Sequence, residues 1–199
     1  MAETIGALLS GRRGHFNMES GYHSEWWFEL GSFFDHPAEL RPFVIELAQR
    51  LASHRIDAVC GPMTGGARLA EMIASELGAR CFVAERSISP QSTGLFPVTY
   101  RIASTERENA RGRSVAIVDD AISAGSAVRG TYADLIACGS RPVALGALVV
   151  FGEAAARFAS ETGLALEAIE RRHFDMWLPA DCPLCRSGVT LDVDAARSG

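Results

Sequence analysis

One stretch, Ser114 to Ala127, constrains the fold more than any other part of this chain. It opens with an apolar run, Val115 to Val118, whose length and composition are typical of a strand buried within a parallel sheet. Two adjacent carboxylates follow, Asp119 and Asp120, and then a loop of small residues from Ala121 to Ser126. The next residues are patterned as a helix, so the stretch predicts a strand, an acid pair and a loop at a helix N-terminus.

The helix after this loop has one apolar face, made by Val128, Tyr132 and Leu135. It is expected to stop at Gly139. The loop N–H groups and the positive end of the helix dipole favour a phosphate, and Ser123 and Ser126 can add hydroxyl donors. Gly125 permits a tight backbone. Carboxylates at the carboxyl end of a strand can bind sugar hydroxyls or a divalent metal, so the stretch can hold a ribose phosphate.

This segment closely resembles the phosphoribosyl-diphosphate (PRPP) signature of type I phosphoribosyltransferases, in which an apolar strand and Asp-Asp precede a Ser/Thr-Ala-Gly-Ser/Thr loop. An ordinary strand-to-helix turn with solvated aspartates is the alternative, but it explains neither the paired acids nor the loop composition. By this resemblance, the PRPP-binding residues are Asp119, Asp120, Ala121, Ile122, Ser123, Ala124, Gly125, Ser126 and Ala127, together with Thr64, Gly65, Gly66 and Arg86.

The composition fits one soluble α/β domain with a small appendage in 199 residues. The net charge of −5 disfavours nucleic-acid binding, and all 19 basic residues are arginine. No apolar run approaches the ~20 residues of a membrane span, and the N-terminus has no basic region of a secretory signal. We therefore expect a cytoplasmic protein that binds neither membrane nor nucleic acid.

Near the N-terminus, residues 1–10 read as a short amphipathic helix. From Gly14 to Gly31 an aromatic-rich, nearly alternating pattern predicts a pair of strands. This part is similar to the N-terminal hood of orotate phosphoribosyltransferases, through Phe16, Ser20, Gly21, Ser24, Trp27 and Phe28. A hydrophobic edge hairpin is the alternative interpretation.

A helix is expected over residues 38–52, followed by a strand over 56–60 and a helix that ends near 77. The turn between the last two, 61–66, contains Gly65 and Gly66 and is a second anion site by its position before a helix. By resemblance it is the pyrophosphate loop of the same family.

Residues 81–84 form a third predicted strand, whereas 85–102 show little periodicity. In the orotate family this segment is a mobile lid, often shared with the neighbouring subunit; a plain β-hairpin tip is the alternative. A strand over 142–151, a helix over 153–162 and a last strand over 164–169 complete the alternation. The pattern predicts a doubly wound, mainly parallel sheet, divided into a hood (1–35), a PRPP-binding core (36–172) and a C-terminal tail (173–199).

Five cysteines without a secretory signal argue against a disulfide framework. Cys60, Cys81 and Cys138 are expected to pack as small core residues. The tail carries Cys182 and Cys185 as a single CxxC, two ligands where a structural zinc needs four. Metal binding there would need help from His173, Asp181 or another subunit; a simple structural turn, of a kind found in one bacterial branch of the orotate family, is the alternative.

Several substrate positions depart from the orotate pattern. Arg86 stands where the family has a lysine beside the pyrophosphate, and it keeps the charge but not the acid–base chemistry. Glu19 replaces a basic residue and would repel PRPP and orotate unless it points away. Phe151, with Val150 before it, replaces an Asp-Arg whose arginine would contact the orotate carboxylate. A neutral or cationic aromatic base would therefore suit the predicted base-binding residues better than orotate: Trp27, Phe28, Ser123 and Phe151.

The resemblance implies a glycosyltransferase of pyrimidine nucleotide metabolism that joins PRPP to a base, orotate by default, with Mg²⁺ and as a homodimer. Asp119, Asp120 and Arg86 are the predicted catalytic residues, and the two aspartates would hold Mg²⁺ together with PRPP. Two alternatives remain: a phosphoribosyltransferase for another base, and a regulator that binds PRPP or a nucleotide without turnover and acts on a protein partner.

Overall fold

The computed structural model describes residues 4–88, 95 and 98–193, and it contains two sheets. The larger has six strands in the order β5-β4-β3-β6-β7-β8, parallel except for the antiparallel pair β4–β5. Its strands are β3 (Ala58–Pro62), β4 (Arg80–Ile88), β5 (Val98–Ile102), β6 (Ser114–Ile122), β7 (Arg141–Phe151) and β8 (Ala165–Arg172). The predicted mainly parallel sheet is confirmed.

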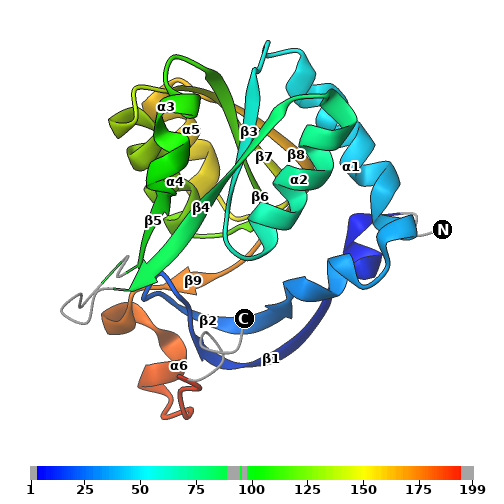
Figure 1. Cartoon of the computed structure of the whole chain (residues 1–199). Helices are drawn as coiled ribbons and strands as arrows, with labels where there is room; N and C mark the ends of the chain where they lie inside the picture. Colours follow the sequence, from blue (N-terminus) through cyan, green and yellow to red (C-terminus); the bar gives the residue numbers. More distant parts are fainter. Residues whose placement is uncertain (1–3, 89–94, 96–97, 194–199) are drawn as a thin grey trace.

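Helices cover both faces of this sheet (Figure 1). One face packs against α1 (Pro37–Ala52) and α2 (Gly65–Leu77), and the other against α4 (Ser126–Ala137) and α5 (Ala154–Thr162). The short α3 (Arg107–Ala110) follows a single 3₁₀ turn, Ser104–Glu106. Both core layers consist of apolar side chains from strands and helices, as a doubly wound fold requires.

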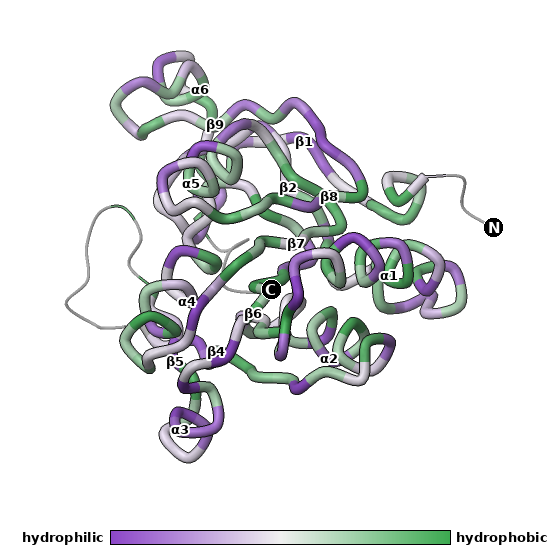
Figure 2. Tube along the Cα trace, turned by 90° about the horizontal axis from the view of Figure 1, so that it is seen from above, coloured by the Kyte–Doolittle hydropathy of each residue, from purple (hydrophilic) through white to green (hydrophobic). Residues whose placement is uncertain are grey.

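A second, antiparallel sheet lies across the carboxyl ends of the parallel strands (Figure 1). We call it the hood sheet; it consists of β1 (Ser10–Asn17), β2 (His23–Glu29) and β9 (Met176–Trp177). After β9 the chain forms a 3₁₀ turn (Pro179–Asp181) and α6 (Pro183–Arg186). Strands from both ends of the chain therefore meet in this sheet. The apolar strands β6 and β7 run through the centre of the molecule (Figure 2).

Three parts of the chain differ from the prediction. The N-terminal segment forms only a 3₁₀ turn, Ile5–Leu8, because β1 already begins at Ser10. β6 does not end before the acid pair but continues to Ile122, because Ala121 still pairs with Val149 of β7. β9 is an additional strand beyond the predicted last one.

Both ends of the predicted lid, 85–102, are β-strand, because β4 extends to Ile88 and pairs antiparallel with β5. The tip of this hairpin, 89–94 and 96–97, lies outside the described residues. Cys60 and Cys138 are buried as expected, but Cys81 is exposed because the alternation of β4 turns its neighbour Phe82 into the core. In the described part of the chain, no helix is long and apolar enough to cross a membrane.

Candidate active site

A cavity of about 500 Å³ lies between the hood sheet and the carboxyl ends of the parallel strands. Residues from the hood, the α2 turn, β4, β5 and the β6–α4 connection line it. Of the predicted site residues, those on this lining are Trp27, Phe28, Thr64, Gly65, Arg86, Asp119, Asp120, Ala121, Ser123, Ser126, Ala127 and Phe151. The remaining ones do not line it: Gly66, Ile122, Ala124 and Gly125 are buried beside it.

The acid pair sits at the end of β6. The backbone N–H of Ala121 donates to Asp120 Oδ1 at 2.8 Å, and the N–H of Asp120 donates to Asp119 Oδ1 at 3.1 Å. Burial raises the pKa of Asp120 to about 6. Burial, together with the charge of Asp120, raises the pKa of Asp119 well above its usual range. A buried carboxylate, Asp120, beside a half-buried one, Asp119, favours a ligand that donates hydrogen bonds or carries positive charge.

The glycine turn packs directly against these carboxylates. A Cβ at Gly65 would lie 1.8 Å from Asp120 Oδ2, and one at Gly66 would lie 2.7 Å from Asp119 Oδ1. A side chain at Gly65 would therefore have to displace the aspartate. The two motifs, far apart in the sequence, form a single surface because Gly65 and Gly66 carry no side chains.

Two helices begin at the cavity, α2 after Thr64 and α4 after Gly125, and none of the described side chains caps either N-terminus. Gly125 has a left-handed φ of 81°, which a residue with a Cβ rarely adopts. The first N–H groups of both helices are thus left for a ligand, and the helix dipoles make that ligand an anion. The arrangement can hold two phosphate groups on either side of the acid pair.

Glu19 points into the cavity rather than away from it. Its Oε2 accepts from Arg86 Nε at 2.9 Å, and its Oε1 accepts from the Tyr100 hydroxyl at 2.7 Å. The Ser126 hydroxyl donates to the same Oε1 at 3.4 Å. Burial and the nearby Glu19 carboxylate raise the pKa of Tyr100 far above its usual range, so the phenol stays protonated and donates. Arg86 therefore neutralises the charge of Glu19.

One end of the cavity is aromatic. The Phe28 and Phe151 rings stack with centroids 4.9 Å apart and planes 8° apart, and Phe174 packs against both at 5.8 and 5.0 Å. Trp27 lines the cavity beside them. This wall suits the face of a planar heterocycle. Phe174 was missed by the sequence reasoning, because nothing in the local pattern distinguishes it from a core residue.

Arg68 is a second missed residue. It lies in the first turn of α2, lines the cavity, and places its guanidinium 4.2 Å from the ring centroid of Phe34. Within the part of the chain that the structure describes, no carboxylate forms an ion pair with Arg68, although its charge opposes the rise in the pKa of Asp120. Its position just after the Gly65–Gly66 turn is the signal that could have revealed it.

The tail cysteines, Cys182 and Cys185, do not line this cavity. The predicted helper His173 is exposed and pairs with Asp175 at 3.2 Å. The carboxyl-end cavity is therefore separate from any metal site in the tail.

Comparisons with known proteins agree with this geometry. The model of the phosphoribosyl transferase domain family matches residues 31–163. The orotate phosphoribosyltransferase of Pelotomaculum thermopropionicum is 32% identical over 195 residues, covering 98% of this chain and 94% of that protein. That of Caldanaerobacter subterraneus subsp. tengcongensis is 28% identical over 187 residues, covering 93% and 90%.

Solved structures share the fold. The orotate phosphoribosyltransferase of Aeropyrum pernix superposes with a TM-score of 0.63 at 20% identity, covering 83% of this chain and 88% of its own. The adenine phosphoribosyl transferase of Trypanosoma brucei, in complex with AMP, pyrophosphate and ribose-5-phosphate, superposes with a TM-score of 0.66 at 13% identity. The match covers 84% of this chain and 77% of that one. This chain therefore belongs to the phosphoribosyl transferase family, within its orotate phosphoribosyltransferase-like group.

Proposed function

We propose that this protein transfers the ribose-5-phosphate of PRPP to a ring nitrogen of a base, with orotate as the acceptor, and releases pyrophosphate. In this reaction the bond between the ribose C1 and the pyrophosphate oxygen breaks, and a bond from C1 to the base nitrogen forms. One observation carries the proposal: an acid pair, two uncapped helix N-termini and an aromatic wall face the same cavity. An ordinary strand-to-helix turn would not gather these features.

The residues have distinct roles in this scheme. Asp119 and Asp120 accept hydrogen bonds from the ribose hydroxyls and stabilise the positive charge that develops on the sugar. The α4 N-terminus, with the Ser123 and Ser126 hydroxyls, holds the 5′-phosphate. The α2 N-terminus and Arg86 hold the pyrophosphate and stabilise its growing negative charge.

The acid pair also fits Mg²⁺. Carboxylate oxygens are the ligands that this hard cation prefers, and the charged forms of Asp119 and Asp120, which burial disfavours, gain from a nearby positive charge. When bound, Mg²⁺ would neutralise charge on the pyrophosphate leaving group. Asp119 and Asp120 would hold it together with PRPP.

Two classes of acceptor fit the cavity. The names of the relatives support orotate, and Arg68, which forms no ion pair with the residues that the structure describes, is a cation that could meet the orotate carboxylate. A neutral base is the second candidate, because Phe28, Phe151 and Phe174 form an apolar wall at one end of the cavity.

Two measurements on the same sample test the proposal. Calorimetry measures the binding of PRPP with Mg²⁺, and orotate and a panel of neutral bases are then added while pyrophosphate release is recorded. We expect PRPP to bind the wild-type chain and to lose that binding in the double variant Asp119→Asn/Asp120→Asn. Pyrophosphate release with orotate supports the main proposal. Pyrophosphate release with another base but not with orotate supports the second candidate. PRPP binding without pyrophosphate release from any base indicates the regulator, and absence of PRPP binding overturns the proposed transferase for either acceptor.

The homodimer is proposed from the family resemblance. Arg86 lines the cavity of its own chain, where it contacts Glu19. Mixed dimers of Arg86→Gln and Asp120→Asn chains test which subunit supplies the clamp. If Arg86 acts within its own chain, no active site of the mixed dimer has both residues intact, and activity is not restored. If Arg86 acts across the interface, one active site of the mixed dimer has both residues intact, and activity is restored.

A further inference from the structure

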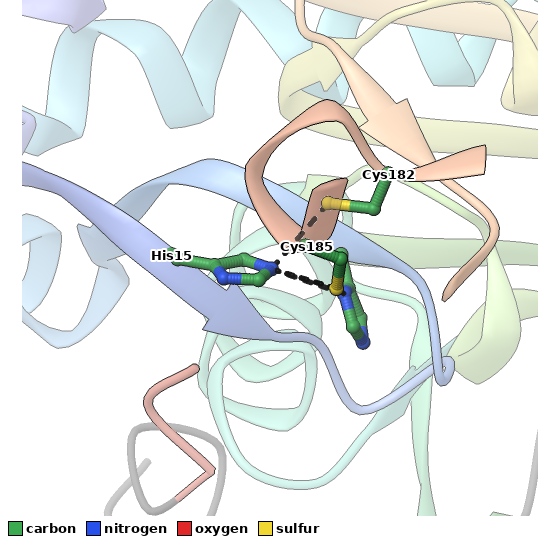
Figure 3. A group of neighbouring side chains, drawn as sticks. His15, Cys182 and Cys185 are labelled. Carbon is green, nitrogen blue, oxygen red and sulfur yellow. Dashed lines mark hydrogen bonds between the residues drawn. The ribbon is translucent and has the colours of Figure 1, made fainter. Parts of the chain in front are cut away.

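Four side chains from distant parts of the chain converge on the outer part of the hood sheet. They are His15 of β1, His23 of β2, and Cys182 and Cys185 at the start of α6, and their ligand atoms all lie within 4.8 Å of one another. His15 Nε2 is 3.1 Å from His23 Nδ1 and 3.4 Å from Cys182 Sγ. Cys185 Sγ is 3.7 Å from His15 Nε2 and 3.3 Å from His23 Nδ1. Figure 3 shows His15 pointing at both sulfurs.

These separations match the edges of a zinc coordination tetrahedron. Zn–N bonds of about 2.05 Å and Zn–S bonds of about 2.3 Å at tetrahedral angles place nitrogen and sulfur about 3.5 Å apart, and two nitrogens about 3.3 Å apart. The observed nitrogen–sulfur distances of 3.3 to 3.7 Å bracket the first value. Two imidazoles and two thiols are also one of the standard donor sets of structural zinc.

An irregularity in β1 turns His15 toward the interior of the hood. A register shift between Arg13 and Phe16 interrupts the β1–β2 ladder, and beside it the consecutive residues His15 and Phe16 are only 3% and 1% exposed. A regular strand would turn one of them outward, so the irregularity re-aims the His15 ring. On β2, His23 pairs with Trp177 of β9, which brings the chain segment that carries the cysteines alongside.

The other ring nitrogen of His15 has a fixed partner. His15 Nδ1 lies 2.8 Å from the carbonyl oxygen of Val189, which can only accept a hydrogen bond. The proton therefore sits on Nδ1, and the lone pair of Nε2 faces His23 and the two sulfurs. A carbonyl that orients a histidine in this way is the usual support of a metal-bound imidazole.

We propose that His15, His23, Cys182 and Cys185 bind one structural Zn²⁺ in tetrahedral geometry. The CxxC pair was expected to need help from His173, Asp181 or another subunit; the proposal instead takes the two further ligands from the hood sheet. Zinc binding displaces the thiol protons, because the thiolate is the ligand form. The site is independent of the proposed transferase chemistry, and its test does not depend on catalysis.

The metal would clamp both ends of the chain together. The β-turn that carries Glu19 lies between the ligands His15 and His23, and Glu19 reaches Arg86 and Tyr100 in the active-site cavity. Zinc would therefore fix the edge of the hood that supplies one wall of this cavity. Loss of the ion should loosen the hood sheet before the parallel core, since the core contributes no ligand.

Metal analysis of the purified chain is the direct test. After growth with zinc and dialysis against metal-free buffer, we expect about one zinc per chain. The variants Cys182→Ser and Cys185→Ser should each lose it, whereas the matched control Cys81→Ser, an exposed cysteine outside the cluster, should keep it. Wild-type chain that holds no zinc after this treatment, or cysteine variants that hold as much as the control, would overturn the proposal.

A second readout needs only the wild-type chain, so a variant that fails to fold leaves the test intact. Replacement of zinc by Co²⁺ should give the intense visible bands of a tetrahedral ion and the charge-transfer bands of thiolate ligands. Octahedral, weak bands would contradict the geometry. A Cys182–Cys185 disulfide found by mass spectrometry in chain prepared under reducing conditions would mean that the cluster binds no metal.

Discussion

The carboxylate of Glu19 and the guanidinium of Arg86 form an ion pair, with Glu19 Oε2 2.9 Å from Arg86 Nε. Each side chain is about one-third exposed or less, at 28% and 31%. The cation that we assign to the pyrophosphate is thus already paired with a carboxylate from the hood. PRPP must displace Glu19 from Arg86, and the protein carries an internal competitor for its own substrate.

Glu19→Gln should strengthen PRPP binding. The amide can still accept from the Tyr100 hydroxyl, but it no longer neutralises Arg86 and no longer repels the substrate phosphates. We expect the dissociation constant for PRPP to fall roughly tenfold, measured by calorimetry with Mg²⁺. Glu29→Gln, which removes an exposed carboxylate on the same cavity, is the control and should change it much less. Weaker binding by Glu19→Gln would mean that the pair supports the site instead of competing.

Gly65→Ala should abolish PRPP binding with only a moderate loss of stability. The new Cβ would lie 1.8 Å from Asp120 Oδ2, so the carboxylate must leave the position in which it meets the ribose. The control is Gly78→Ala at the other end of α2, where φ is 62°. It should cost about 1 kcal/mol of unfolding free energy and leave PRPP affinity unchanged. Equal PRPP affinities of wild type and Gly65→Ala would contradict the proposed contact.

Asp120→Asn should be more stable than wild type at neutral pH in magnesium-free buffer. Because burial raises the pKa of Asp120 to about 6, the wild-type folded state gains from the protonated acid at low pH and loses this gain as pH rises through 6. The variant should therefore exceed wild type by on the order of 2 kcal/mol at pH 7.5, and the difference should shrink towards pH 4.

Urea denaturation at several pH values measures this difference. Asp35→Asn, at an exposed aspartate outside the cavity, is the control and should follow the wild-type curve. If the advantage of Asp120→Asn does not depend on pH, the carboxylate is not strained by burial.

Phe151→Leu should weaken base binding selectively. The change keeps most of the buried volume but removes the ring that stacks on Phe28. We expect KM for the base to rise roughly fivefold, with KM for PRPP within about twofold, in steady-state kinetics. Phe33→Leu, a fully buried core phenylalanine away from the cavity, is the matched control for lost stability and should leave both constants unchanged. A parallel rise in both constants would place Phe151 in the scaffold and not in the base site.

The parallel core was predictable because its signals are local. A buried apolar run at 115–118 and a glycine turn before α2 have the same meaning in almost any α/β protein, and the structure confirms both elements. The acid pair and the small-residue loop before α4 were recognised for the same reason: the residues that form each motif are neighbours in sequence.

The missed features depend on contacts between distant residues. No local pattern tells that Glu19 meets Arg86, or that the Gly65 turn lies against Asp120. The clearest case is the tail, where the CxxC was visible but its partners were sought nearby at His173. The real neighbours, His15 and His23, come from the opposite end of the chain, and only the hood sheet brings them there.

The hood sheet also sets an order of assembly during translation. His23 pairs with Trp177, and Phe16 bridges to Asp192, so the sheet is completed only by residues that are synthesised after the parallel core. The parallel strands are all synthesised by Arg172 and can fold earlier. The nascent protein can therefore form the acid pair and both helix N-termini before the hood sheet over them is complete. A premature stop or a protease cut before Met176 should leave a folded core that cannot close over a base.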